Sequence, residues 1–533
     1  MSANSTVGRY VVELLAANGI DVVFGIPGVH TLELYRGLAL TGMRHVLVRH
    51  EQNAGFAADG YARVTGRPAA AFVISGPGMT NVLTAMAQAY SDSVPMIVVA
   101  SSPVRPSLGK GWGVLHEVPD QLALGAGVAG LARAASSAED VRDHLRAMFA
   151  SFRTGRARPT YLQIPLDLLG EPTNLVAEKF VVPDTRLSPP QDAIERAASA
   201  LVTAKRPLII AGGGAREASG SLLRLVDTLD AYYVSTTAGK GLLPEDHPAN
   251  LGASLPFRET QELIAAADVV VAVGTELSET DFYTGTRLPM SARLIRIDLD
   301  PAKLSDQYGA EIPVWGDARA SLEAIETSVK KRSGWRREAG PAAHHRAKIE
   351  RSLNAPARAR LNALRAIREA VPANGVVFSD QTQIAYLGNF AYAANRPGSW
   401  FHPCGYGALG FALPAAIGAK IAQPERAVVS LAGDFGLQFT MQDLMTAVEL
   451  KLSLPVVVWN NSALGQIRDD MQAAGIPPVG VVALNPDFVA LARAFGAEGV
   501  RVTGPGALAE GVGKALTHKG PTLIEAVEAD FLS

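Results

Sequence analysis

The stretch Leu431-Ala-Gly-Asp-Phe-Gly436 decides the fold: an apolar run that ends in glycine and an acid. A helix-length segment separates it from a second run, Leu454-Pro-Val-Val-Val-Trp-Asn-Asn461. Such runs are typical of buried parallel strands, and ligands bind beyond the carboxyl ends of parallel strands. Asp434 and Asn461 are therefore expected to converge, although they lie 27 positions apart. Their oxygens suit Mg²⁺, and backbone N–H groups around Gly433 and Gly436 suit phosphate. A plain turn followed by a strand-end cap remains the alternative.

The same alternation of short β-branched runs and helical stretches extends along the chain in both directions. It predicts buried parallel strands joined by crossover helices. The predicted strands lie at 22–24, 71–74, 96–99, 160–164, 207–211, 268–273, 294–298, 375–378, 426–431 and 454–459. We therefore predict an α/β protein of three doubly wound parallel-sheet domains.

The length of 533 residues is too great for one hydrophobic core and favours three units. We predict a first domain over residues 1–170 and a proline-rich linker over 171–192. A Rossmann-like middle domain is predicted over 193–340 and a third domain over 341–533. A charged, helical stretch from about 329 to 360 leads into the third domain.

Composition excludes several classes of function. The formal net charge of -2 provides no basic field for nucleic acid. No apolar run approaches the ~20 residues needed to span a bilayer, and the start of the chain lacks a targeting signal. The single cysteine, Cys404, cannot form an internal disulfide. We expect a cytoplasmic enzyme that acts on a small molecule, without nucleic-acid or membrane partners.

Three segments resemble one known family, in the right order along the chain. Gly433-Asp434 followed by Asn460-Asn461 resembles the metal and diphosphate motif of thiamine diphosphate enzymes, GDG followed by NN, with Phe435 in place of the last glycine. Residues 24–28, 49–63 and 75–81 are similar to the pyrimidine-binding domain of the acetolactate synthase-like branch. The chain is identified as a member of this family, which includes acetolactate synthases and 2-oxo acid decarboxylases. The resemblance covers nearly the whole chain.

The resemblance implies the cofactors and most of the site. The carboxyl group of Glu51 would bind the pyrimidine ring and activate the cofactor. In the family this glutamate reaches the cofactor of the neighbouring subunit, which implies a homodimer or homotetramer with active sites at the interface. Leu409 would be the apolar wedge under the bent cofactor, and the Gly407 carbonyl would accept from its amino group. The implied thiamine diphosphate contacts are Pro27, Gly28, Gly76, Asn81, Thr382, Gln383, Gly407, Leu409, Gly433, Asp434, Phe435, Gly436, Asn461, Ala463, Leu464 and Gly465. The implied Mg²⁺ ligands are Asp434, Asn461 and Ala463.

Two histidines bear on the outcome of the reaction. Acetolactate synthases carry a Gln-Glu pair where this chain has His116-Glu117, and simple 2-oxo acid decarboxylases carry histidine at a similar position. An imidazole can deliver a proton near neutral pH, which favours release of an aldehyde. His30 is a second candidate. An acetolactate synthase-like carboligase or acyltransferase remains an alternative, as does a non-catalytic nucleotide-binding homologue.

The middle domain offers little sign of a flavin. It carries Glu276-Leu-Ser-Glu-Thr280 in place of the Arg-Phe-Asp-Asp-Arg run of FAD-binding acetolactate synthases, and Gly212-Gly-Gly214 alone is a weak dinucleotide signal.

Two adjacent acids indicate the substrate. Asp469 and Asp470, with Gln466 nearby, follow the predicted metal loop and suit a guanidinium tail, which forms bidentate bonds with carboxylates. The Gly-Ile-Pro-Gly-Val-His-Thr turn at 25–31 and the Gln-Ile-Arg-Asp-Asp segment at 466–470 together resemble 5-guanidino-2-oxopentanoate (2-ketoarginine) decarboxylases of arginine catabolism, which implies 4-guanidinobutanal and CO2 as products. A solvated helical face is the alternative for the two acids.

Overall fold

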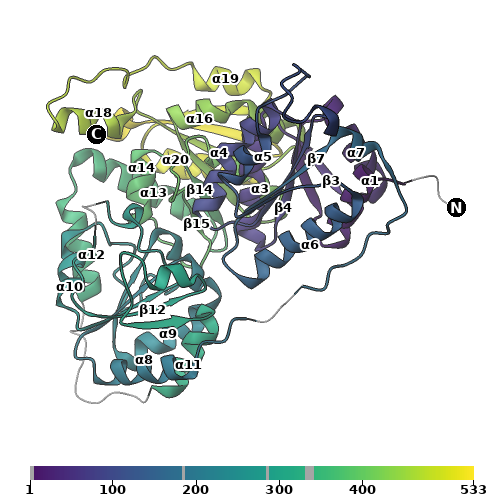
Figure 1. The fold of residues 1–533 in the computed structure, drawn as a ribbon. Coiled ribbons are helices and arrows are strands. Elements are labelled where there is room, and N and C mark those ends of the chain that lie inside the picture. Colours follow the sequence, from purple (N-terminus) through teal and green to yellow (C-terminus); the bar gives the residue numbers. More distant parts are fainter. Residues whose placement is uncertain (1–4, 183–185, 284–286, 330–340, 533) are drawn as a thin grey trace.

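The computed structural model describes residues 5–182, 186–283, 287–329 and 341–532. Three sheets of parallel strands follow one another along the chain, and helices cover them (Figure 1). This confirms the predicted α/β class with three parallel-sheet domains. No helix in these ranges has the length and apolar character needed to cross a membrane.

The N-terminal sheet has the strand order β3-β2-β4-β5-β7-β6. Its strands β4, β5 and β7 are buried along their whole length, which explains their largely apolar sequences. A short antiparallel pair, β1 with β8, joins the residues after this sheet to the start of the chain. The strands are β1 (Ser5–Thr6), β2 (Val22–Gly25), β3 (Arg44–Leu47), β4 (Ala69–Val73), β5 (Met96–Ser102), β6 (Leu131–Ala134), β7 (Pro159–Pro165) and β8 (Pro172–Thr173). The helices are α1 (Val7–Ala17), α2 (Leu32–Thr41), α3 (Glu51–Thr65), α4 (Pro77–Ser91), α5 (Gln121–Ala126), α6 (Ala138–Thr154) and α7 (Leu166–Gly170), with 3₁₀ turns at Val29–Thr31 and Arg105–Ser107.

The middle sheet has the order β10-β9-β11-β12-β13 and is parallel throughout. Its strands are β9 (Pro207–Ala211), β10 (Tyr232–Ser235), β11 (Val269–Val273), β12 (Arg293–Asp298) and β13 (Ile312–Trp315). Its helices are α8 (Gln191–Thr203), α9 (Ser219–Leu229), α10 (Arg258–Ala266) and α11 (Ala318–Ser328), with 3₁₀ turns at Gly213–Ala218, Thr237–Gly239, Glu279–Asp281 and Pro301–Leu304.

The C-terminal sheet has the order β15-β14-β16-β17-β19-β18. Of the helical stretch predicted over 329–360, residues 330–340 lie outside the described residues. The strands are β14 (Val376–Ser379), β15 (Trp400–Phe401), β16 (Val428–Gly433), β17 (Leu454–Asn460), β18 (Glu498–Val502) and β19 (Pro521–Val527). The helices are α12 (Pro341–Ser352), α13 (Ala355–Ala370), α14 (Gln383–Ala391), α15 (Ala412–Ala422), α16 (Asp434–Thr440), α17 (Leu444–Glu449), α18 (Gly465–Ala473), α19 (Phe488–Ala494) and α20 (Gly504–Thr517), with 3₁₀ turns η7 (Met441–Asp443) and η8 (Glu528–Phe531).

The N-terminal and C-terminal domains share one hydrophobic core. Helices α3 and α15 cross there so closely that a Cβ atom at Gly60 would meet the backbone of Ala415, and one at Gly418 would meet the backbone of Ala57. Figure 1 shows these two domains, purple to blue and green to yellow, side by side, with the teal middle domain below them. The first and last thirds of the chain therefore form one packed unit.

Candidate active site

Three loops meet at the carboxyl edge of the C-terminal sheet. Strand β16 lies between β14 and β17, and all three run parallel. The residues that directly follow these strands are Asp380, Asp434, which opens helix α16, and Asn461. Both predicted metal side chains therefore lie at one sheet edge, as the strand pattern predicted.

Asp434 is the first residue of α16 and is 2% exposed. Burial raises the pKa of its carboxyl group, and a hydrogen bond from Asn485 partly offsets that rise. The Asn485 amide nitrogen lies 2.7 Å from Asp434 Oδ2 and 3.0 Å from Asn460 Oδ1. Asn485 thus ties two loops of the site together. It lies 51 positions from Asp434 in a segment without regular structure, so no local sequence signal pointed to it.

The loop after β17 lies beside Asp434. The Ser462 N–H points to the Asp434 carboxylate, and Ser462 itself has a positive φ of 52°. The Asn461 side-chain oxygen accepts from the Ala463 N–H at 3.1 Å, which folds the loop back on itself. Within the described ranges Asp434 forms no ion pair, so its buried charge has no basic neighbour. A buried carboxylate without a cation, beside an Asn460 amide oxygen that shares its Asn485 donor, is a donor set that fits Mg²⁺.

Asp380 holds the loop that carries Gly407 and Leu409. Its carboxylate is 1% exposed and accepts from the Gly410 N–H at 3.0 Å and the Ala412 N–H at 3.5 Å. The carbonyl group of Gly410 is also held, because it accepts from the Thr440 hydroxyl at 2.9 Å. Burial raises the pKa of Asp380 to about 6. Leu409, half-buried, directly precedes this clamped residue. Asp380 follows the predicted strand at 375–378, so the sequence carried a signal for it. Its role as a hydrogen-bond acceptor for the loop that carries Leu409 was not predicted.

Gln383 and Asp469 form one hydrogen-bonded group. Gln383 accepts from Arg360 at 2.8 Å and donates to Asp469 Oδ2 at 2.7 Å. Asp469 also pairs with Arg468 at 2.9 Å. Asp470 is exposed and accepts from Gln466 at 3.0 Å. Of the two predicted substrate acids, Asp469 therefore also orients a predicted cofactor contact.

Glu51 opens helix α3 in the N-terminal domain, directly after the N-cap residue His50. The Asn81 amide donates to Glu51 Oε2 at 2.9 Å. A Cβ atom at Gly78 would lie 3.6 Å from Glu51 Oε1, so only a small residue borders that oxygen there. The structure thus brings together Glu51 and Asn81, which the sequence placed in one site.

The two candidate histidines also meet. The rings of His30 and His116 pack edge to face with centroids 4.9 Å apart. His30 Nδ1 lies 2.8 Å from the Ser75 hydroxyl, and burial together with the charge of His116 lowers the pKa of His30. A Cβ atom at Gly76, where φ is 60°, would lie 2.6 Å from the His116 carbonyl oxygen. Glycine at 76 therefore allows the His116 loop to approach.

Helix α4 relates the N-terminal half of the site to the C-terminal half. Asn81 on its first turns binds Glu51, whereas Gln88 accepts from the Ala408 N–H at 3.1 Å. Ala408 lies in the loop of residues 405–410, called the wedge loop after the role predicted for Leu409. Seven residues of helix separate these contacts, which corresponds to about 10 Å along the axis. Within one chain, Glu51 and the wedge loop thus contact different turns of helix α4.

Comparison with known proteins identifies the family. Three models of thiamine pyrophosphate enzymes match: the N-terminal TPP binding domain over residues 5–124, the central domain over 194–325 and the C-terminal TPP binding domain over 380–526. A Pseudomonas aeruginosa protein named "Probable 2-ketoarginine decarboxylase AruI" is 49% identical over 500 residues, covering 92% of this chain and 88% of that protein. The Escherichia coli acetolactate synthase isozyme 3 large subunit is 32% identical over 538 residues, covering 95% and 91%. The chain belongs to the thiamine pyrophosphate enzyme family.

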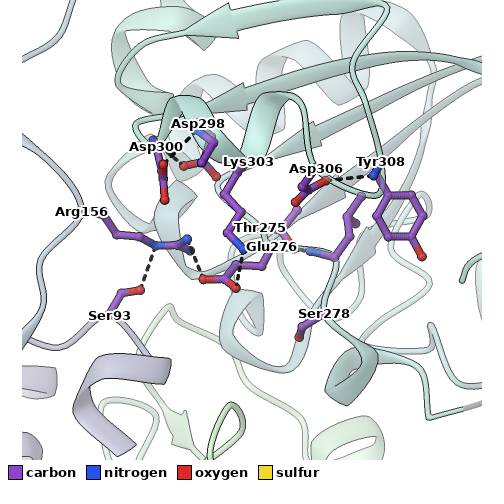
Figure 2. Close-up of polar contacts among 12 residues, drawn as sticks. Ser93, Arg156, Thr275, Glu276, Ser278, Asp298, Asp300, Lys303, Asp306 and Tyr308 are labelled. Atoms are coloured by element: carbon purple, nitrogen blue, oxygen red, sulfur yellow. Dashed lines mark hydrogen bonds and ion pairs between the residues drawn. The ribbon is translucent and has the colours of Figure 1, made fainter. Parts of the chain in front are cut away.

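The middle domain of this thiamine pyrophosphate enzyme closes its own sheet edge with ion pairs (Figure 2). Glu276, just after β11, lies 2.6 Å from Arg156 and 3.2 Å from Lys303. Arg156 comes from the N-terminal domain, where it also donates to the Ser93 hydroxyl at 2.9 Å. Gly214 packs so tightly that a Cβ atom there would lie 2.8 Å from Gly274 Cα. The glycines at 212–214 thus serve close loop packing.

Proposed function

We propose that the chain decarboxylates 5-guanidino-2-oxopentanoate to 4-guanidinobutanal and CO2, without oxidation, as a step of arginine catabolism in the cytoplasm. The 49% identity to the Pseudomonas protein carries this proposal. The edge-to-face pair of His30 and His116 supports it, because an imidazole at the reacting carbon favours protonation and release of an aldehyde over coupling.

The cofactors in the proposal are thiamine diphosphate and Mg²⁺. When bound, thiamine diphosphate supplies the nucleophilic carbon and the electron sink that cleavage of a 2-oxo acid requires. Asp434, Asn461 and Ala463 are the proposed metal ligands, since they follow the neighbouring parallel strands β16 and β17 and Asp434 is a buried acid without a basic neighbour. The wedge loop around Leu409, held by Asp380, is the proposed support for the two rings.

Glu51 and the histidines move the protons in this proposal. Glu51 holds the activating proton on Oε1, because Oε2 is engaged by Asn81. His30 is held through Nδ1 by Ser75, which leaves Nε2 as the nitrogen that delivers a proton to the product carbon. Asp470, exposed beside the Asp469 group, is the proposed partner of the guanidinium tail.

A product assay tests the proposal. The purified chain is incubated with thiamine diphosphate and Mg²⁺ and with either 5-guanidino-2-oxopentanoate or pyruvate, and the products are identified by mass spectrometry. We expect the guanidino-aldehyde from the first substrate and no coupled product from either. Acetolactate from pyruvate, with no guanidino-aldehyde, would instead favour the carboligase activity named for the Escherichia coli relative.

We further propose that two copies complete each active site. Large apolar side chains are exposed beside both halves of the site, including Val29 and Leu115 next to the histidines and Leu484 next to Asn485. Exposed apolar patches of this kind mark interaction surfaces. In a twofold dimer, mixing Glu51→Gln and Asp434→Ala chains gives heterodimers with one intact site, so about a quarter of wild-type activity should return. An inactive mixture, with heterodimers verified by mass spectrometry, would place Glu51 and Asp434 in the same chain's site.

A further inference from the structure

Asp443 is a buried acid of the C-terminal domain that binds the N-terminal domain on both sides of Glu51. It ends the 3₁₀ turn η7 and is 1% exposed. Its Oδ1 accepts from the Arg49 N–H at 3.1 Å, and its Oδ2 accepts from the Asn53 side-chain amide. One carboxylate therefore grips the residue two positions before Glu51 and the residue two positions after it.

A second group reinforces this grip. The Thr446 hydroxyl lies 2.6 Å from Asp443 Oδ1 and 3.1 Å from the Leu47 carbonyl oxygen, between the two domains. The Arg49 side chain pairs with Glu449 at 2.8 Å on the surface. The connection from β3 into α3 is thus attached to η7 and α17 along its length.

Packing of the two domains against each other does not require a buried carboxylate at position 443. Helices α3 and α15 already pack backbone against backbone further along, at Gly60 and Gly418. Burial of Asp443 has a desolvation cost, visible as a raised pKa that its hydrogen bonds to Thr446, Asn53 and Arg49 only partly offset. A buried polar contact of this kind fixes direction more than it adds stability. What Asp443 fixes is the first turn of α3, and Glu51 is its first residue.

We propose that Asp443 is a positioning residue that sets the placement of the Glu51 carboxyl group. The inference rests on the proposed role of Glu51 in cofactor activation. In this proposal, the C-terminal domain of a chain positions the Glu51 carboxyl group, which belongs to the N-terminal domain of the same chain. Asn81 holds the Glu51 side chain, whereas Asp443 holds the backbone from which that side chain extends.

The test separates activation from binding. In Asp443→Ala holoenzyme we expect kcat and the hydrogen–deuterium exchange rate at C2 of bound thiamine diphosphate, followed by NMR, to fall together by roughly 10-fold. The KM for the 2-oxo acid and the Kd for thiamine diphosphate should stay within about twofold, since Asp443 contacts neither proposed binding loop. Asp443→Asn, which keeps the size and one acceptor oxygen, should fall less in both rates and covers the case in which the alanine variant does not fold.

Two further variants decide the interpretation. Glu449→Gln removes the exposed pair with Arg49 in the same interface and should leave the exchange rate unchanged. Glu51→Gln should abolish most of the exchange and at least about 99% of turnover. Wild-type exchange in Glu51→Gln would overturn the proposed role of Glu51. Loss of exchange in Glu51→Gln, together with wild-type exchange and a lowered melting temperature in both Asp443 variants, would overturn the inference alone and leave Asp443 a purely structural residue.

Discussion

The middle and C-terminal domains place acids at the same edge of similar parallel sheets, but the two edges treat these acids in opposite ways. In the middle domain Glu276 lies against Arg156, Lys303 and, at 3.7 Å, Arg158. In the C-terminal domain Asp434 and Asp380 are 2% and 1% exposed, and within the described residues neither forms an ion pair. Glu276 is neutralised by the chain's own cations, whereas Asp434 and Asp380 are buried acids whose partners are N–H groups.

The ion pairs of Glu276 hold two domains of the chain together, so we call that sheet edge the docking edge. The edge at Asp434 is the proposed site for a ligand, so we call it the binding edge. Arg156 and Arg158 belong to the N-terminal domain, so the ion pairs of Glu276 join two domains of one chain. A buried carboxylate without a cation is costly unless hydrogen bonds, a ligand or a metal compensate it. Under the proposed function, Mg²⁺ would compensate the buried charge of Asp434, which the fold itself leaves without a cation.

Asp434→Ala should give the largest effect. If Asp434 is a metal ligand, its removal should weaken binding of thiamine diphosphate with Mg²⁺ by about 4 kcal/mol, a factor of roughly 1,000. Calorimetry with the cofactor at fixed Mg²⁺ measures the change, and the cofactor-induced rise in melting temperature should disappear with it. Glu276→Gln is the matched control from the other edge. Equal affinities in wild type and Asp434→Ala would show that Asp434 is not a metal ligand.

The interior strands of each sheet were predicted because a buried parallel strand is a continuous apolar run. Every strand at a sheet edge was missed: β3 and β6, β10 and β13, β15 and β18. Strand β18 is partly solvated, with exposed Glu498 and Arg501, so no apolar run marks it, whereas β15 is buried but only two residues long. One interior strand, β19, was also missed, because the buried Glu525 interrupts its pattern while accepting from Asn460 at 2.7 Å.

The residues of the candidate site also divide into those with a local sequence signal and those without one. Residues in local motifs, such as Asp434, Asn461 and Glu51, were found from short stretches of sequence, and the family assignment that these stretches supported is confirmed. Their individual roles remain predictions. Asn485 and Asp443 were missed because their contacts bridge 51 and about 390 positions of sequence, a separation over which a single chain carries no periodic signal.

Asp380→Asn should give the second largest effect, and it appears as a change in pH dependence. The folded-state pKa of about 6 lies above the ordinary value of 3.8, so folding favours the protonated form. The stability associated with Asp380 is then full below about pH 4 and is lost as pH rises through 6, by up to about 3 kcal/mol. In the apoprotein, the difference in unfolding free energy between wild type and Asp380→Asn should follow this curve between pH 4 and 7. A difference that does not vary with pH would mean that Asp380 is ionised throughout, as a paired acid would be.

Glu276→Gln should give the smallest effect, and one confined to stability. Its ion pairs are partly solvated, with side-chain exposures of 27% for Glu276 and 18% for Arg156, so their loss should cost about 1 kcal/mol. Added salt should shrink that cost, because screening weakens the same pairs in wild type. Urea unfolding measures the change, and Glu279→Gln, an exposed acid of the same loop, serves as the control.

Affinity for thiamine diphosphate should stay within about twofold of wild type, because docking of the middle domain leaves the segments at Asp380, Asp434 and Asn461 in place. A tenfold loss of cofactor affinity would mean that the middle-domain edge reaches the binding edge, through Arg156, Ser93 and the neighbouring Asp92, which accepts from the Gly405 N–H of the wedge loop at 2.8 Å.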